Sequence, residues 1–465
     1  THWDEYHAIF NNLVHRSATE NIIKNIQEGY SVIIHGKAGS GKSGCLQELI
    51  HYLNDSHILY LALKLDKHIP TSTSDIYGKQ LGLPESPIHC LATIAAGKPC
   101  VLILDQLDAL RWNGNHSGEA LSVCKEFILQ ADAINKCSGG KISIVFASRT
   151  FDLENDAGLK NLFVSKESER HVSLNWLKVN VDFFTVEDVV KIIGESYNGL
   201  SQRLKKLLLT PSSLYVWSKL EEKDRANSIF SVLDLMNKWW KQIQAHCELS
   251  GILSSDTITC KSKIVESMET RNVFSLPASL LADYQKIIDS FVSNGLLNYN
   301  INMQSISFTH QSFLDYFIIS GIINKIYSGS DLKDLIGKID DQTPLIRYRV
   351  LSVLQNLIES DQAVFIDQSI KLLNCNTVRY YFKCTVFEII GQYESPEAKI
   401  FEIVDSYKEK PEWSDYIHQV VFYGHLPYVL HFMKSHQGWF SDSELWLLKS
   451  ISHKAPDFVT ETVLP

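Results

Sequence analysis

The chain has 465 residues, 45% of them hydrophobic, which is enough for about three domains with buried cores. Its 44 Lys and Arg against 53 Asp and Glu give a net charge of −9, which argues against a dedicated nucleic-acid binder. No apolar run reaches the roughly eighteen residues of a membrane span, and the nine cysteines form no CxxC pair. We therefore expect a cytoplasmic protein with reduced thiols and, since it begins at Thr1, a portion of a longer chain.

The first predicted elements are a helix over residues 18–27, a strand over 31–34 and a helix after residue 42. Between the last two stands Gly-Lys-Ala-Gly-Ser-Gly-Lys-Ser, a complete phosphate-binding P-loop, whose glycines let backbone N–H groups turn toward phosphate oxygens. Lys42 is expected to reach the β- and γ-phosphates, and Ser43 to ligate Mg²⁺. The predicted nucleotide contacts here are Gly36, Lys37, Ala38, Gly39, Ser40, Gly41, Lys42, Ser43 and Gly44.

The segment before the first helix offers one more candidate. In many P-loop ATPases this approach segment lies over the adenine, so Arg16 is a candidate contact to the base. A plain helix-capping turn explains the same residues equally well, and the sequence leaves both interpretations open.

After a strand over 57–63 and a helix over 86–96, four aliphatic residues end in Asp105. This is the Walker B pattern, in which a buried parallel strand carries a carboxylate to the Mg²⁺ site at its carboxyl end. Asp108 adds a second carboxylate that could orient or deprotonate the attacking water. Many P-loop ATPases use Glu for this role, so an Asp here predicts slow hydrolysis, and the assignment of the base stays open.

A further buried strand over 142–147 leads to Arg149, which at a strand tip beside Walker B could sense a γ-phosphate. The alternative is that Arg149 pairs with Asp152 or another surface acid. A fifth apolar run lies near residues 172–179. Strands alternating with helices predict a three-layer α/β domain with a parallel sheet over residues 1–183.

From Thr185, a helix cap followed by acidic residues, the pattern becomes helical and predicts a small helical domain over 184–253. Pro211 interrupts it. A proline just inside a new helix is conformationally preset, so Pro211 could be an ordinary first helical residue. It could also lie against the adenine or ribose and close the nucleotide site.

Residues 254–325 predict a winged-helix domain, because helices are followed by a hairpin of 296–299 with Ser305–Phe308 and by another helix. Such domains often bind DNA. Between residues 254 and 320 the basic residues are Lys261, Lys263, Arg271 and Lys286, and the acidic ones are Asp256, Glu266, Glu269, Asp283, Asp289 and Asp315. A module with more acids than bases is a poor reader of a phosphate backbone, so direct nucleic-acid binding by this segment is not expected.

Residues 326–465 show consecutive amphipathic segments and predict an irregular all-α solenoid. Its aromatic clusters, residues 380–382 and 439–440, are expected to lie between helices rather than on a binding surface. The segments cover residues 345–358, 364–373, 378–393, 398–407, 414–423 and 443–451.

The run Phe-Thr-His-Gln-Ser-Phe-Leu-Asp-Tyr-Phe over 308–317 resembles the Phe-x-His-x-Ser-Phe-x-Asp-Tyr-Phe signature of NACHT-type STAND ATPases. With the P-loop and the run from Asp105 to Asp108, residues 1–325 are most similar to the bacterial antiviral STAND NTPases. The family's histidine contacts the β-phosphate of bound ADP, which implies this role for His310. By itself, a His at a helix start is more often a cap or a core residue. Ala109 stands where NACHT proteins commonly carry a further acid.

The resemblance implies an ATP/ADP switch with Mg²⁺, triggered by a viral (phage) protein on the C-terminal helices, which then forms a homo-oligomer and activates an attached effector. Two alternatives stay open. A winged-helix, DNA-associated ATPase of replication or transcription control would need a basic recognition face, which the sequence lacks. A continuously cycling remodelling ATPase would need a strong catalytic acid and an arginine supplied by a neighbouring subunit.

Overall fold

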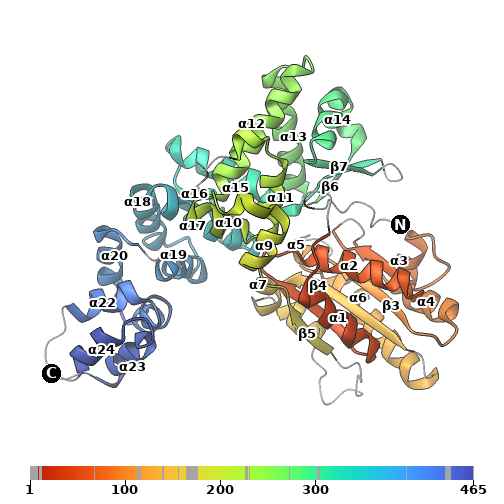
Figure 1. Cartoon of the computed structure of the whole chain (residues 1–465), viewed down its shortest axis with the longest axis horizontal. Coiled ribbons are helices and arrows are strands. Elements are labelled where there is room, and N and C mark those ends of the chain that lie inside the picture. The colour runs from red at the N-terminus through yellow and green to blue at the C-terminus, as the bar shows by residue number, and fades with distance from the viewer. Residues whose placement is uncertain are drawn as a thin grey trace. The chain divides into compact units, whose positions relative to one another are not determined.

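A computed structural model of the whole chain describes residues 9, 13–66, 69–112, 117–138, 141–155, 157–163, 176–225, 229, 231–271, 273–300, 304–393, 395–434 and 441–463. The chain divides into two compact units, Thr1–Tyr316 and Phe317–Pro465, which are described separately. Their elements can be followed in Figure 1.

The first unit contains a five-stranded sheet in which every neighbouring pair runs parallel, in the order β2-β3-β4-β1-β5. The two strands β3 and β4 are buried along their whole length, as continuous aliphatic runs predict for central parallel strands. Because the strands are parallel, the carboxyl ends of β1, β3 and β4 meet at one edge, where ligands bind in such sheets. The strands are β1 (Ser31–Gly36), β2 (Leu59–Lys64), β3 (Cys100–Asp105), β4 (Ile142–Arg149) and β5 (Trp176–Asn180).

Helices cover both faces of this sheet (Figure 1). Val101 and Ile103 on β3 pack into one core with α1 and α2, while Leu102 and Leu104 pack into another with α4 and α6. The predicted three-layer α/β fold is thereby confirmed. The helices of this part are α1 (Ser17–Gln27), α2 (Lys42–Asp55), α3 (Ser74–Gln80), α4 (Pro87–Ala95), α5 (Ala109–Trp112), α6 (Ser117–Ser138), α7 (Thr150–Asn155) and α8 (Ala157–Leu162).

Three elements differ from the sequence-based expectation. Strand β2 begins at Leu59 because His57 has a positive φ of 53°, which belongs to a turn. Helix α3 lies in a segment expected to be a polar connection, and the Thr73 side chain caps it by accepting a hydrogen bond from the Ile76 N–H. The described part of the fifth strand begins at Trp176, and the start of the predicted run, 172–175, lies outside the described residues.

The next part of the first unit is helical, as predicted. The Thr185 side chain accepts from the Asp188 N–H while the Asp188 carboxylate accepts from the Thr185 N–H, a capping box that starts α9. Pro211 is the first residue of α11, where its missing N–H has no structural cost. The elements are α9 (Val186–Ile193), η1 (Gly194–Tyr197), α10 (Gln202–Leu208), α11 (Pro211–Lys219), η2 (Glu222–Asp224) and α12 (Val232–Leu249).

The segment predicted as a winged helix contains the expected hairpin, in which β7 and β8 run antiparallel. It also contains a strand that the sequence analysis did not anticipate, β6, which pairs with β8 to give the order β6-β8-β7. Pro277 ends β6 and lacks an N–H, which suits an edge strand. The helices and the hairpin were expected here and the strand β6 was not, and the assignment of a winged-helix domain stays a prediction. The elements are α13 (Ser254–Arg271), β6 (Ser275–Pro277), η3 (Ala278–Tyr284), α14 (Gln285–Ser293), β7 (Leu297–Asn300) and β8 (Ser305–Phe308).

Helix α15 (Gln311–Tyr327) spans the division between the units, and the described part of the second unit is helical, as predicted. Here α17 packs against α18 and α19, and α18 against α20, as in a stack of helix pairs. The sequence analysis missed α16, α22 and α24 and merged α21 with the π-helix η5. The elements are α16 (Leu332–Leu335), η4 (Ile339–Asp341), α17 (Pro344–Ser360), α18 (Gln362–Leu373), α19 (Tyr380–Gln392), α20 (Ala398–Lys408), α21 (Ser414–Ile417), η5 (His418–Phe422), α22 (Leu426–Lys434), α23 (Asp442–Ile451) and α24 (Pro456–Val463).

Aromatic side chains join these helices. Phe382 is fully buried, as predicted for this cluster, whereas Tyr380, which stacks on Trp413 with ring centroids 4.5 Å apart, is 49% exposed. The other, at residues 439–440, lies outside the described residues. Across the described part of the chain, no helix combines the length and apolar character needed to cross a membrane.

Candidate nucleotide-binding site

The P-loop connects β1 to α2 in a conformation that requires glycine. Gly39 and Gly41 have φ values of 73° and 93°, in the left-handed region that side chains disfavour. A Cβ built on Gly39 would lie 2.3 Å from Ser212 Oγ, so the loop approaches the start of α11 more closely than any side chain permits. Close backbone approach at a helix N-terminus is the geometry that binds phosphate.

Lys42, the first residue of α2, folds back over this loop. Its ammonium donates to the backbone carbonyl oxygens of Gly36, 3.1 Å away, and Lys37, 3.0 Å away. Burial lowers the pKa of Lys42 to about 8, because a desolvated ammonium is disfavoured. A phosphate would replace those carbonyl oxygens as the ammonium's partner, as the sequence predicts.

Ser43 and Asp105 meet at the sheet edge. The Ser43 hydroxyl donates to Asp105 Oδ2 at 3.0 Å, and the Gln106 N–H donates to Asp105 Oδ1 at 2.9 Å. Burial raises the pKa of Asp105, which is 2% exposed, while the nearby Lys64 opposes that shift. A hydroxyl beside a carboxylate supplies the oxygen ligands that Mg²⁺ takes. The loop and the acid therefore have the arrangement of a P-loop beside a Walker B carboxylate.

Arg149, at the end of β4, forms ion pairs with two buried acids. Its Nε lies 3.3 Å from Asp108 Oδ2, and its Nη2 lies 3.2 Å from Asp315 Oδ2. The Arg149 N–H also donates to Asp108 Oδ1 at 3.2 Å, so both oxygens of that carboxylate are engaged. Of the two interpretations left open for Arg149, pairing with an acid is the arrangement found here, although the acids are buried. The roles of Arg149 as a phosphate sensor and of Asp108 as a base stay predictions.

The helical part of the unit closes the cleft from the other side. Pro211 lies beside Gly41, with its Cγ 3.4 Å from the position of a Cβ on that glycine. The Ser212 N–H donates to the Gly39 carbonyl oxygen at 3.3 Å, which ties α11 directly to the P-loop. Both Pro211 and Ser212 line the cleft, so the proline is the first helical residue and a wall of the site at once.

His310 lines the same cleft and is held by aromatic rings. Its ring meets that of Tyr215 edge-on at 4.8 Å and that of Phe313 at 5.2 Å. The Tyr215 hydroxyl donates to the Gly295 carbonyl oxygen at 3.4 Å, which joins α11 to the hairpin that precedes His310. His310 is therefore both packed and directed at the cleft, and its contact with a phosphate stays a prediction.

Arg16 lies beside the P-loop and binds backbone oxygens there, and its contact with the base stays a prediction. Its guanidinium donates to the backbone carbonyl oxygens of Ser40 at 3.3 Å and Asp182 at 2.6 Å, and it lies over the Phe184 ring. Its side chain gives α1 no capping hydrogen bond, although Arg16 occupies the cap position. Arg16 thus joins the P-loop to the chain leaving β5, a role that neither sequence interpretation included.

The cleft takes its lining from segments that lie far apart in the sequence, and it is open to solvent on one side. Several residues that line it were missed. Gln106, Thr309, Gln311 and Ser312 stand inside motifs that the sequence showed, but no role could be given to them, whereas the others have no motif and only the fold brings them to the cleft. Lys64 ends a strand directly beside Asp105 in the sheet register. The missed residues are Ile9, Lys64, Gln106, Ala147, Ser212, Tyr215, Thr309, Gln311 and Ser312.

Buried polar atoms test whether the cleft suits a nucleotide. Within the described residues, Ser40 Oγ, Thr309 Oγ1 and Gln311 Nε2 are buried and make no hydrogen bond. Thr309 and Gln311 line the cleft, and Ser40 belongs to the P-loop. An unsatisfied buried polar atom costs about 1–3 kcal/mol. A ligand rich in phosphate and hydroxyl oxygens supplies such partners, so the residues present fit ATP or ADP.

No protein-family model and no curated protein matches the chain. Solved structures do resemble it. The Aeropyrum pernix ORC2 protein is 10% identical over 68% of this chain and 95% of its own, with a TM-score of 0.32. A Cdc6p from Pyrobaculum aerophilum is 11% identical over 66% of this chain and 93% of its own, with a TM-score of 0.30.

A third similar structure is a Signal Transduction ATPase with Numerous Domains (STAND) protein with a tetratricopeptide repeat sensor, from Pyrococcus horikoshii. It is 14% identical over 97% of this chain and 72% of its own, with a TM-score of 0.32. Identities and scores this low carry no argument about activity, so function has to be argued from the site.

Proposed function

We propose that the chain is a nucleotide-dependent molecular switch of the STAND type. The observation that carries this proposal is the composition of one cleft, which the P-loop, Pro211 at the start of α11 and residues 309–312 before and within α15 line together. A nucleotide bound there touches three segments of the chain at once. Whether the nucleotide is a diphosphate or a triphosphate then determines how stably those segments are held together. A ligand shifts the equilibrium between two states of a protein only if it binds one state more tightly than the other.

In the proposed resting state, ADP lies in the cleft with its β-phosphate between Lys42 and His310. Ser43 and Asp105 would hold Mg²⁺, which supplies charge neutralisation to the phosphates when bound. Asp108 has both carboxylate oxygens engaged by Arg149, so it is poorly placed to accept a proton from water in this arrangement. Slow hydrolysis is the consequence we propose.

The trigger is proposed to act on the helical second unit. A viral (phage) protein that binds this array better in an active state than in a resting one would shift the chain toward nucleotide exchange, homo-oligomerisation and activation of an attached effector in antiviral defence. The support is the NACHT-type signature over residues 308–317, which contains His310 in the cleft and Asp315, the ion-pair partner of Arg149.

A role for the winged-helix segment in DNA binding is not favoured. Two of its basic residues lie over aromatic rings, with Lys261 Nζ 5.2 Å from the Trp240 ring centre and Lys263 Nζ 5.1 Å from that of Tyr284. Burial also lowers the pKa of Lys261. Cations held in this way contribute little to a phosphate-binding face.

The test is the particle mass of the full-length protein in ATP and Mg²⁺, with and without lysate from virus-infected cells. The proposal expects a discrete oligomer only with infected lysate, and none for Lys42→Ala, which removes the phosphate-binding ammonium. His310→Ala should loosen ADP, whereas Tyr316→Phe, a change within the same signature at a residue hydrogen-bonded to Asn237, should not. A constant mass under all conditions would contradict the switch, and salt-dependent binding to duplex DNA would favour the alternative.

A further inference from the structure

Asp315 and Asp108 hold the guanidinium of Arg149 between them. The distances are 3.2 Å from Nη2 to Asp315 Oδ2 and 3.3 Å from Nε to Asp108 Oδ2. All three residues are buried, with 7% of Arg149, 2% of Asp108 and 3% of Asp315 exposed. Ion pairs between buried residues are only weakly screened by water and salt, so the charges of this cluster act strongly on other charged groups nearby.

The neighbours of Asp315 fix its position. Phe313 packs against Trp239 at 5.0 Å, and the Tyr316 hydroxyl donates to Asn237 Oδ1 at 2.6 Å. These contacts join the first turns of α15 to α12 on either side of Asp315 in the sequence. The carboxylate is therefore directed at Arg149 by a packed helix and not by a mobile side chain.

We propose that Asp315 determines specificity by engaging the guanidinium that a γ-phosphate would otherwise bind, so that this arrangement selects a nucleoside diphosphate over a triphosphate. The inference rests on the proposed nucleotide site and adds a reason for its preference. Arg149 lines the same cleft as Lys42 and Ser43 and ends the strand beside Asp105. Arg149 is thus the basic residue at the carboxyl end of β4, next to the strand that carries the predicted Mg²⁺ ligand Asp105.

Charge balance gives the direction of the effect. The cluster has two carboxylates for one guanidinium, and the Lys42 ammonium, which interacts with both Asp108 and Arg149, balances the second carboxylate. A γ-phosphate adds further negative charge there and competes with Asp315 for the same donors. ADP does neither, which leaves the cluster intact.

The test uses the full chain with Asp315→Asn, a change that removes the charge but keeps an oxygen able to accept from Arg149. Calorimetry would measure the affinities for ADP and for the non-hydrolysable β,γ-imido analogue of ATP, both with Mg²⁺. We expect the analogue to bind about tenfold more tightly, the size of one charge-assisted hydrogen bond. The affinity for ADP should stay within about twofold, since ADP does not compete with Asp315.

Three variants make the result specific. Tyr316→Phe loses a hydrogen bond of the same helix turn and should leave the ratio of the two affinities unchanged, and Asp315→Glu, which keeps the charge, should do the same. In an Arg149→Met background, Asp315→Asn should have no further effect on the ratio, because its target is gone. Should Asp315→Asn fail to fold, as judged by its thermal transition, Asp315→Ser repeats the measurement.

An unchanged ratio, or an equal loss of affinity for both nucleotides, would overturn the inference and leave only a structural role for Asp315. If the unaltered chain bound neither nucleotide, the proposed function would fail with it. The two failures are therefore distinguishable by the ADP affinity of the unaltered protein.

Discussion

His15 Nδ1 lies 2.8 Å from Glu48 Oε1, and the other ring nitrogen of His15 lies 2.9 Å from Glu20 Oε1. A carboxylate only accepts hydrogen bonds, so both bonds form together only when the ring is protonated and both of its nitrogens donate. The bond to Glu20, and then that to Glu48, raises the pKa of His15. Glu48 also accepts from the Arg16 N–H and the Thr19 hydroxyl, which joins the approach segment to the helix after the P-loop.

This pair predicts a pH-dependent contribution to stability. A His whose folded-state pKa exceeds its unfolded value stabilises the fold fully below about pH 6.5, and the contribution is lost as the pH rises through the folded value. His15→Ala should therefore lower the melting temperature at about pH 5.5 and have little effect well above the raised pKa. Because the ring is exposed, the contribution should be below about 1 kcal/mol. Calorimetry across this pH range would check it, and a pH-independent difference would refute the ionic explanation.

Gly39 and Gly82 offer a matched pair for testing the P-loop. Their φ values, 73° and 79°, are alike, but a Cβ on Gly39 meets Ser212 Oγ at 2.3 Å, whereas one on Gly82 meets nothing within 4 Å. Both Gly→Ala changes should cost about 1 kcal/mol of stability through backbone strain. Only Gly39→Ala should also weaken ADP binding, about tenfold or more, because the added methyl group displaces the Ser212 side chain and disturbs the P-loop. Equal ADP affinities in titrations of the two variants would show that the close approach is unimportant.

Substitutions of Arg16 can distinguish a structural role in supporting the P-loop from a contact with the nucleotide base. Arg16→Ala removes the hydrogen bonds to the Ser40 and Asp182 carbonyl oxygens and should cost about 1–2 kcal/mol in denaturant unfolding. Arg16→Lys should restore little, because one ammonium cannot reproduce the fork of a guanidinium. If Arg16 only supports the P-loop, Arg16→Ala should lower the affinity for ADP and the affinity for GDP by the same factor. A change confined to one base would instead support the contact predicted from the sequence.

The residues that sequence reasoning found are those whose chemistry is local. Ser43 lies in an eight-residue motif and Asp105 ends an aliphatic strand, and parallel strands then bring their carboxyl ends together. The three-layer fold follows from the same runs. The helix α3 was missed because its segment has polar and Pro-rich surroundings, although Thr73 supplies a cap.

The rest of the site depends on long-range contacts. Arg149 and Asp315 are 166 residues apart, and no pattern in the sequence joins them, so only a nearby surface acid could be suggested as a partner. Tyr215 has no motif and reaches the cleft only because α11 begins at Pro211. The hydrogen bonds of Arg16 could not be anticipated from the sequence, because their acceptors are backbone oxygens, which every residue has.

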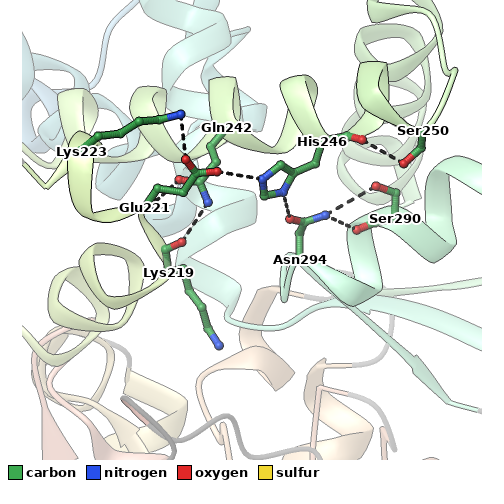
Figure 2. A network of polar contacts seen from close by, with 8 residues as sticks. All are labelled: Lys219, Glu221, Lys223, Gln242, His246, Ser250, Ser290 and Asn294. Atoms are coloured by element: carbon green, nitrogen blue, oxygen red, sulfur yellow. Dashed lines mark hydrogen bonds and ion pairs between the residues drawn. The ribbon is translucent and has the colours of Figure 1, made fainter.

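The His246 side chain links the helical part of the first unit to the winged-helix segment. Its Nδ1 lies 2.6 Å from Asn294 Oδ1, and its Nε2 lies 3.2 Å from Glu221 Oε1 (Figure 2). Asn294 Nδ2 donates to the Ser290 carbonyl oxygen at 2.8 Å, which fixes the amide with its oxygen toward the ring. The ring thus joins α12 both to α14 and to the residues after α11.

His246→Ala removes both bonds and should lower the free energy of unfolding by about 1–2 kcal/mol. None of these residues lines the cleft, so ADP affinity should stay the same. His246→Gln, which can still reach one partner, should recover part of the loss. Lys223→Ala is the control within the same network. The exposed Lys223 side chain pairs with Oε2 of Glu221, whereas His246 binds Oε1, so the unfolding midpoint of this variant should not move. Urea unfolding followed by tryptophan fluorescence would measure all three, and equal midpoints for His246→Ala and Lys223→Ala would show that the bridge carries no stability.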